Sequence, residues 1–446
     1  MTVRASILAA AALAAGLTGP VRAQQPDTVV TLPDAVRRAL ASHPTVQGAA
    51  AAARGADAAV GEARARWLPQ LTTSASFTRF EEPMIVFPLH GFDRPVEQIA
   101  FDRTLVQGNV SLAWTLFDGG LRGARIRGAR AEAGARDAAL ATAEAHVIAL
   151  VARRYLDVLT AGAVLEARDD GLRALTAEEA RVVQLVREGE AADVALLRVR
   201  AALAEARAER AAAAAELDVA LRGLARTIGA PALGPGAIRA VRTRDSVPPR
   251  DSLLAGLVAR NPQLAEARSA ADAARWGRRA AVAAWFPQLD ATGALLGYGG
   301  ANQSLASEWQ VGVRLSYPLF LGGRAQSVRR TGAQADAAEA RYRALRLDAE
   351  DAVDAAVGAG TAARARADAV ETAVTHLAEV ARVERLALEA GAGTEAEYLR
   401  AEADLRRVRA ELARARAAVV LARVELARLT GDLTLTWLDR MLETTP

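Results

Sequence analysis

Cysteine is absent from this chain of 446 residues, which excludes both a disulfide framework and a thiolate metal site. Lysine is absent as well, so the basic residues are arginines and four histidines, and the net charge is only +4 because acids are interleaved with the arginines. Aromatic residues make up 4% of the chain. A nucleic-acid-binding protein would show clustered basic patches with stacking aromatics. We therefore expect no nucleic acid as a partner.

Long apolar runs are also missing. Charges interrupt every helical stretch beyond residue 23, and none offers about 18 consecutive uncharged apolar residues, the length that a spanning helix needs. The first 23 residues have a basic start at Arg4, a short apolar stretch and a small-x-small ending at 21–23. This pattern predicts a secretory signal peptide, 1–23, that is cut before Gln24. If this exported chain crosses a membrane, it does so with β-strands.

The chain contains an internal repeat. The phrase WLPQL at 67–71 returns as WFPQL at 285–289. Further pairs follow in the same order, first at an offset of 218 residues and then at 202–203, and this ordered self-similarity indicates a duplicated structural unit. The predicted organisation is a first structural repeat, a Pro/Gly-rich linker, a second structural repeat and a C-terminal tail without recognisable features, at 24–231, 232–250, 251–432 and 433–446 respectively.

The repeated phrase predicts a switch from helix to strand. A helix of about 25 residues should run from Pro44 to Trp67 and another from Pro262 to Trp285, since proline is favourable at the first position of a helix. Pro69 and Pro287 should end these helices, because a proline pushes the preceding residue out of the α region.

Alternating strands follow each switch. Apolar residues occupy every second position of 106–116 and 309–319, runs of about 11 residues, which is typical of a tilted membrane-spanning strand. Their partner strands lie near 71–80 and 289–298 and alternate less well, which gives strand hairpins at 71–117 and 289–320. The alternation alone fits a half-buried soluble strand equally. Export of the chain favours the membrane interpretation.

Two glycine pairs, Gly119–Gly120 and Gly322–Gly323, should let each hairpin turn back into helix. Proline-free stretches then predict long helical hairpins at 121–228 and 324–430, with breaks at Gly189 and at Gly391–Gly393. About 68 residues at 1.5 Å each give a rod on the order of 100 Å. Four strands cannot close a barrel, and open edges are not tolerated in lipid, so several chains must contribute to it.

These motifs in this order resemble the outer-membrane efflux protein family, the TolC-like channels. The family pattern has a helix ending in lPqL, a hairpin closing in lFdGG, and long helices ended by LtG; the chain shows it twice. The resemblance implies an α+β membrane protein: a homotrimer with a twelve-stranded β-barrel, four strands per chain, in the outer membrane, and a coiled-coil α-helical tunnel in the periplasm. It also implies contact with outer-membrane lipid, a periplasmic adaptor (membrane fusion) protein and an inner-membrane transporter, in tripartite efflux or type I secretion.

The resemblance also implies where the pore closes. In the family, carboxylates six and nine residues after the second tip glycine narrow the pore. Counted from Gly391, these positions are Glu397 and Arg400, so an acid–base pair replaces the two acids. We expect this pair at the periplasmic gate; the alternative is a solvated i,i+3 pair on a helix, which contributes little.

The hairpin tips, 191–197 and 393–399, should contact the adaptor. The candidate residues are glycines at the breaks and the first residues of the returning helices: Gly189, Asp193, Leu197, Gly391, Gly393, Thr394 and Leu399.

Two other classes of protein, an enzyme and a periplasmic scaffold, fit the sequence less well. For an enzyme, the four histidines (His43, His90, His146 and His376) show no metal-ligand spacing, and neither a catalytic residue, a metal nor a cofactor is expected. A periplasmic coiled-coil scaffold would explain the helices but not the two proline-started hairpins. The stretch 81–105 is expected to form the longer extracellular loop.

Overall fold

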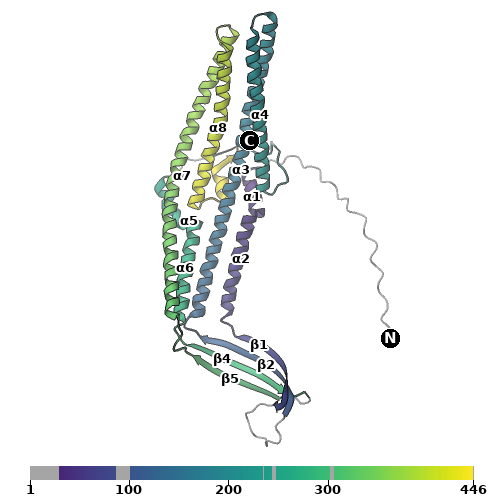
Figure 1. The fold of residues 1–446 in the computed structure, drawn as a ribbon. Coiled ribbons are helices and arrows are strands. Elements are labelled where there is room, and N and C mark those ends of the chain that lie inside the picture. Colours follow the sequence, from purple (N-terminus) through teal and green to yellow (C-terminus); the bar gives the residue numbers. More distant parts are fainter. Residues whose placement is uncertain (1–29, 87–100, 235, 244–247, 302–305, 445–446) are drawn as a thin grey trace, which may run out of the picture.

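The computed structural model describes residues 30–86, 101–234, 236–243, 248–301 and 306–444. The expected signal peptide, His90 and most of the expected extracellular loop lie outside these residues. The chain is elongated, with a bundle of long helices at one end and a single four-stranded sheet at the other (Figure 1). No helix of the described residues is both long and apolar enough to cross a bilayer.

The helices follow the repeat. α2 (Pro44–Ala65) and α6 (Pro262–Ala283) lead toward the sheet, while α3 (Leu121–Glu188) and α7 (Arg324–Glu389) lead away from it and return as α4 (Asp193–Thr227) and α8 (Glu395–Thr430). Both α2 and α6 begin with proline and are capped by the preceding side chain: His43 accepts a hydrogen bond from Thr45 N and Asn261 from Leu264 N. Such caps satisfy amide groups that have no partner within the helix.

The switch occurs as the repeated phrase predicts. α2 ends at Ala65, a turn covers 66–68, and strand β1 (Gln70–Ile85) begins directly after Pro69. In the second repeat α6 ends at Ala283, and β4 (Gln288–Gly299) begins directly after Pro287.

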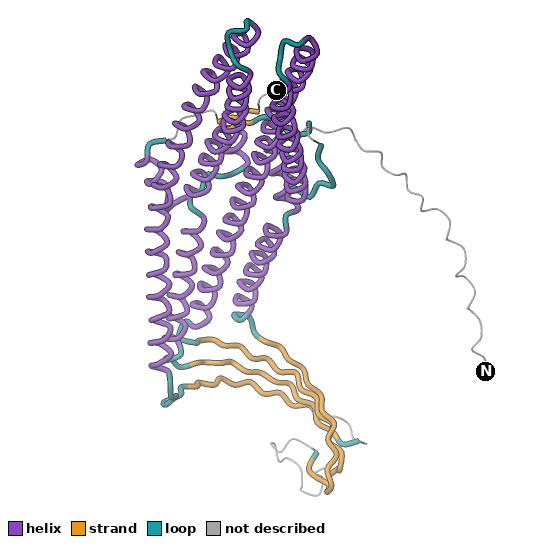
Figure 2. The backbone as a smooth tube through the Cα atoms, turned by 45° about the horizontal axis from the view of Figure 1, so that its top comes forward, coloured by secondary structure: helices purple, strands orange, loops and turns teal. Residues whose placement is uncertain are grey.

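The sheet is antiparallel, with the order β1-β2-β4-β5, and its strands curve side by side as one layer (Figure 2). β2 spans Phe101–Phe117 and β5 spans Ala306–Ser316. Within the first repeat Gln70 lies opposite Ala113; within the second, Gln288 lies opposite Ser316. These are corresponding positions of the repeat, so the two hairpins have the same register.

Two strand predictions need correction. The run predicted at 106–116 belongs to a longer strand, because β1 and β2 continue their pairing up to Ile85 and Phe101; part of the expected extracellular loop is therefore strand. The run predicted at 309–319 ends at Ser316 instead. Pro318 explains the shorter strand, since proline has no N–H to donate to a strand ladder.

The sheet has one apolar face and one polar face. A row across all four strands contains Leu71, Leu112, Gly293 and Val311, and the adjacent row contains Thr72, Ser111, Ala294 and Gln310. Val311 is 77% exposed in the single chain, and Trp309, Val313 and Leu315 on the same strand are also exposed. An apolar face that no other part of the described chain covers is the pattern of strands that meet lipid.

The glycine pair of the first repeat sits in a tight turn. Gly119 and Gly120 have φ of +64° and +87°, a region that residues with a side chain adopt at a cost. A Cβ atom on Gly119 would lie 2.4 Å from the Phe286 Cβ and 2.8 Å from the Ala283 carbonyl oxygen. The turn of the first repeat is thus packed against the switch of the second. Of the pair in the second repeat, only Gly323 has a positive φ.

The linker and the tail are structured, which the sequence did not predict. The short helices α1 (Leu32–Ser42), α5 (Arg250–Arg260) and α9 (Leu435–Met441) flank the long ones, and β3 (Val241–Thr243) of the linker pairs with β6 (Leu442–Thr444) of the tail. Leu438 of the tail is fully buried in the main apolar core.

Tyr155 of α3 lies at the centre of the core and forms hydrogen bonds with the segment before α1 and with the linker. Its hydroxyl lies 3.1 Å from the Val30 carbonyl oxygen and accepts a hydrogen bond from Arg239 N at 3.0 Å. Burial raises the pKa of Tyr155 to about 12, so the phenol stays neutral and can keep these contacts.

Candidate functional site

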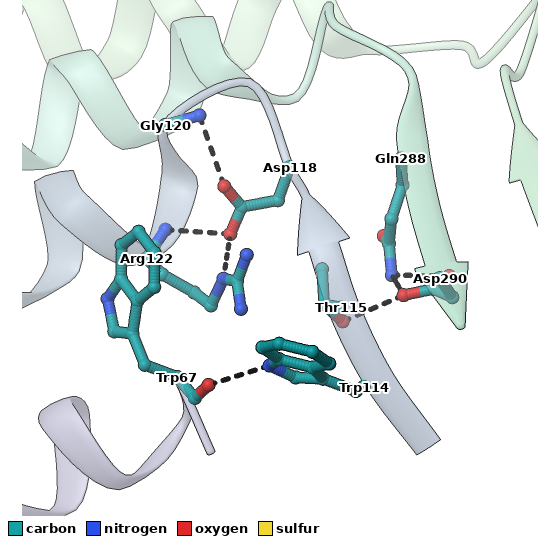
Figure 3. Close-up of polar contacts among 8 residues, drawn as sticks. All are labelled: Trp67, Trp114, Thr115, Asp118, Gly120, Arg122, Gln288 and Asp290. Atoms are coloured by element: carbon teal, nitrogen blue, oxygen red, sulfur yellow. Dashed lines mark hydrogen bonds and ion pairs between the residues drawn. The ribbon is translucent and has the colours of Figure 1, made fainter. Parts of the chain in front are cut away.

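The junction between helices and sheet in the first repeat is built from aromatic and charged side chains (Figure 3). The indole N–H of Trp114 donates to the Trp67 carbonyl oxygen at 2.9 Å, which fixes the end of α2 on the apolar face of the sheet. The Arg122 guanidinium lies 4.4 Å from the centre of the Trp67 ring, within the range of a cation–π contact.

Asp118 neutralises this arginine. Its carboxylate accepts hydrogen bonds from Gly120 N at 3.1 Å, Arg122 N at 2.9 Å and Arg122 Nε at 2.8 Å. Both side chains are about nine-tenths buried. A carboxylate that binds the first amides of α3 also complements the positive end of the helix dipole.

On the polar face, Thr115 donates to Asp290 at 2.7 Å, and Gln288 donates to the same carboxylate (Figure 3). These bonds link the strands of the two repeats where they approach the helices. All six expected switch residues lie between a helix and a strand: Pro69, Pro287, Gly119, Gly120, Gly322 and Gly323.

The hairpin tips at the other end of the molecule are short turns. Gly189, with φ of +77°, closes α3, and Asp193 is the first residue of α4. Gly391, with φ of +74°, follows α7, and Thr394 caps α8. The left-handed glycines allow each helix to reverse within a few residues.

The expected gate residue Glu397 has a structural partner in this chain. Its carboxylate accepts a hydrogen bond from Thr394 N at 2.9 Å and Thr394 caps the Glu397 amide, forming a capping box at the start of α8. These hydrogen bonds hold the pKa of Glu397 below its usual value, and the charge of Arg400 lowers that pKa further. Among the described residues Arg400 forms no ion pair with Glu397 within 4 Å, and both side chains are exposed.

A second charged cluster at the tips was missed by sequence reasoning. Glu178 of α3 is buried and forms a two-pronged ion pair with Arg181, 2.6 Å at its shorter arm. Glu395 of α8 lies nearby with one buried oxygen that has no hydrogen-bond partner, and burial, followed by the charge of Glu178, raises the pKa of Glu395. No sequence signal could reveal this cluster, because its members come from different repeats.

The expected adaptor-contacting residues differ in exposure. Leu197 of α4 is 64% exposed, and Val194 beside it is exposed as well. Leu399 of α8 instead packs partly against the apolar cluster that Leu175 of α3 and Leu203 of α4 form. The exposed large apolar side chains near the tips thus lie on α4, at Val194 and Leu197, and on α7, at Val383 and Leu386.

In the part of the chain that the structure describes, no group of three or more His, Asp or Glu side chains could hold a metal ion. His43 caps a helix, and His146 and His376 lie within helices.

Comparison with known proteins assigns this architecture to a family. The family model "Outer membrane efflux protein" matches residues 35–230 and 253–432, which correspond to the two repeats. No curated protein matches the chain in sequence.

Solved structures share its fold. The CmeC outer membrane channel of Campylobacter jejuni has a TM-score of 0.77 at 16% identity, over 90% of this chain and 85% of that one. VceC of Vibrio cholerae has a TM-score of 0.75 at 19% identity, over 90% and 96%. The MtrE outer membrane channel of Neisseria gonorrhoeae, solved in its open state, has a TM-score of 0.74 at 18% identity, over 90% and 91%.

The uncovered apolar sheet, the long helical hairpins and the duplicated family match agree with one another. The chain belongs to the outer membrane efflux protein family, whose members are TolC-like channels of the outer membrane and not enzymes.

Proposed function

We propose that three copies of this chain form one conduit, which takes substrates from a periplasmic adaptor and an inner-membrane transporter to the exterior. The observation that carries this proposal is the four-stranded sheet with an uncovered apolar face and two free edges, β1 and β5. In lipid, unpaired backbone groups at a strand edge cost several kcal/mol each. Both edges must therefore pair with other copies.

The pairing between the repeats supplies a template for the pairing between copies. β2 of the first repeat pairs with β4 of the second, and Val110 lies opposite Leu295. If this pairing is repeated around the barrel, β5 of one copy lies beside β1 of the next. The repeat counterparts of Val110 and Leu295 are Val313 and Phe77, so these two residues should face one another across the boundary between copies.

The arrangement of the helices is compatible with the same contact between copies. α3 packs against both α4 and α8 within the chain, which leaves α4 and α7 as the outer helices of the tip region. Exposed apolar residues lie on both outer helices, Leu197 on α4 and Val380 and Val383 on α7. The contact of α7 with α4 of the next copy would cover them and close the tunnel.

A double-cysteine variant tests the assembly. The chain has no cysteine of its own, so Phe77→Cys combined with Val313→Cys should form disulfides only between copies, and mild oxidation should give a covalent trimer on denaturing gels. Opposed strand residues have Cα atoms close enough for a disulfide.

The matched control keeps Phe77→Cys and moves the second cysteine to Arg314, which lies on the polar face. Little cross-linking is expected there. Equal cross-linking of both pairs, or a ladder that continues beyond three chains, would contradict the closed trimer.

We also propose that Glu397 and Arg400 border the periplasmic constriction. Glu397 is exposed at the start of α8, close to the end of the tunnel, and its pKa is lowered, so it is charged at neutral pH. Glu397→Gln should reduce the preference of the pore for cations, because it removes the charge while glutamine still completes the capping box.

Reversal potentials in a salt gradient across a planar bilayer would measure this preference. Glu402→Gln, on the same helix but beyond the tip, serves as the control. An unchanged cation preference in Glu397→Gln would count against the gate role.

The tip residues Gly189, Asp193, Leu197, Gly391, Gly393, Thr394 and Leu399 are proposed as the adaptor-contacting surface. The exposure of Leu197 supports a contribution of α4 to this surface.

A further inference from the structure

The two helical hairpins of the chain touch near their tips. α3 with α4 forms the first hairpin and α7 with α8 the second, and both extend away from the sheet (Figure 1). Leu399 of α8 packs against the apolar cluster that contains Leu175 of α3 and Leu203 of α4. Tyr398, the preceding residue of α8, is buried. Movement of the second hairpin away from the first would break this contact.

Three charged side chains lie beside this contact, and their charges do not balance. Glu178 of α3 is buried, and Arg181 donates to its two carboxylate oxygens, from Nε at 3.0 Å and from Nη2 at 2.6 Å. Glu395, the first residue of α8, has one buried oxygen, Oε1, without a hydrogen-bond partner. Since the pair of Glu178 and Arg181 is neutral by itself, an ionised Glu395 adds a negative charge to a contact that is largely closed to water.

Further charged groups around the contact leave this imbalance in place. They are Arg198 of α4, Arg385 and Glu389 of α7, and Glu402 of α8. Of these, Arg198 acts on Glu395, but Arg198 is exposed, where water screens its charge. Burial raises the pKa of Glu395, the charge of Glu178 raises it further, and the arginines nearby do not cancel these effects.

A proton on Glu395 would remove both costs. The neutral carboxyl group is less expensive to bury than a carboxylate, and it no longer repels Glu178. It also gains an O–H donor, while the carboxylate of Glu178 is an acceptor with further lone pairs. The packed arrangement of the hairpins is therefore more favourable with the proton than without it.

We propose that Glu395 makes the contact between the hairpins sensitive to pH: when its carboxyl group binds a proton, the second hairpin is held against the first. Glu397 and Arg400 follow on the same helix, so the hairpin that Glu395 holds also carries the gate proposed above. Acidification of the periplasm then closes the tips of the tunnel. This inference rests on the proposed conduit, because the tips close a pore only in the assembled protein.

The contact strengthens as the pH falls. The pKa of Glu395 in the packed tips lies above its ordinary value of 4.5, so the packed tips bind the proton more tightly than separated tips do. The stabilisation is complete below that ordinary value and is lost as the pH rises through the raised pKa. Glu397 titrates separately, because its hydrogen bonds to Thr394 lower its pKa. Tyr398 stays neutral in acid, since burial raises its pKa.

Pulsed electron spin resonance on the assembled protein tests the proposal. Spin labels at Ala192→Cys and Ala392→Cys, exposed residues of the two tip turns, report the distance between the hairpins, and the chain has no cysteine of its own. Assemblies that contain one labelled chain restrict the measurement to distances within that chain. The fraction of short distances should rise when the pH is lowered from about 8 to about 5.

Two variants separate Glu395 from the other titrating groups. Glu395→Gln keeps the shape of the side chain without its charge, so the short distance should persist at every pH of the titration. Glu178→Gln should move the midpoint about one pH unit lower, because it removes the like charge and frees Arg181 to pair with Glu395. Glu190→Gln, at an exposed acid of the first tip turn, is the control and should leave the titration unchanged.

Tip distances that do not respond to pH in the unmodified chain would overturn the proposal, as would an unchanged response in Glu395→Gln. Conductance of the unmodified protein in planar bilayers keeps this proposal apart from the proposed function. Absence of conductance at every pH would reject the conduit, whereas conductance that fails to fall on acidification would reject only the pH-sensitive contact.

Discussion

Val311→Arg should destabilise the assembled protein in lipid by about 2–4 kcal/mol, the cost of an arginine on the lipid face near the middle of a membrane strand. Val311 belongs to the apolar row that crosses all four strands, and none of the other residues that the structure describes covers it. Urea titration of the protein in phosphatidylcholine vesicles, followed by the loss of the assembled form on gels, would measure the change.

Gln310→Arg is the matched control. Gln310 is the neighbouring residue on the same strand and points to the polar face, where a charge remains in contact with water. We expect it to change stability by less than about 1 kcal/mol. Equal destabilisation by the two variants would mean that the faces of the sheet have been assigned wrongly.

Gly431→Ala should have the second large effect. Gly431 ends α8 with φ of +78°, and a Cβ atom there would lie 2.1 Å from the Arg260 carbonyl oxygen. The clash is with backbone atoms. Two further contacts hold α5 and the end of α8 together here: Asn261 Nδ2 donates to the Leu429 carbonyl oxygen at 2.7 Å, and Arg260 forms an ion pair with Asp432 at 3.0 Å. No side-chain rotation can relieve the clash.

Gly391→Ala separates the clash from the backbone strain. Gly391 has nearly the same φ, +74°, but nothing lies within 4 Å of the added Cβ atom. It should cost about 1 kcal/mol, the price of a left-handed alanine. Gly431→Ala should cost about 3 kcal/mol more, the scale of an overpacked site. Thermal unfolding followed by far-ultraviolet circular dichroism would compare them, and similar unfolding temperatures would contradict the close packing of Gly431.

The repeated prolines and glycines made much of the fold predictable. Pro69 and Pro287 act locally, through the restriction that each places on the preceding residue, so the switch from helix to strand could be predicted without knowledge of the tertiary structure. The long helices were equally predictable from the sequence, since no proline interrupts 121–188 or 324–389.

Long-range packing set the limits of prediction. The tail offers few sequence signals, yet Leu438 is buried because it meets α1 and the core around Tyr155, which lie hundreds of residues away. The alternation of apolar residues predicted a strand over 309–319, but β5 ends at Ser316, before Pro318, because alternation takes no account of the missing N–H of proline.

The candidate sites were less predictable than the fold. The resemblance pointed to Glu397 but not to its contact with Thr394, although the Thr-x-x-Glu spacing at 394–397 is a capping-box signature that the sequence itself offers.

Electron microscopy of the detergent-extracted protein tests the central claim most directly. The account predicts a hollow cylinder with threefold symmetry and a helical part on the order of 100 Å long, the length of α3 at 1.5 Å per residue. At one end it should carry a single barrel of twelve strands, with β5 of each copy beside β1 of the next. Particles without a lumen, or open chains of copies with unpaired β1 and β5 edges, would contradict it.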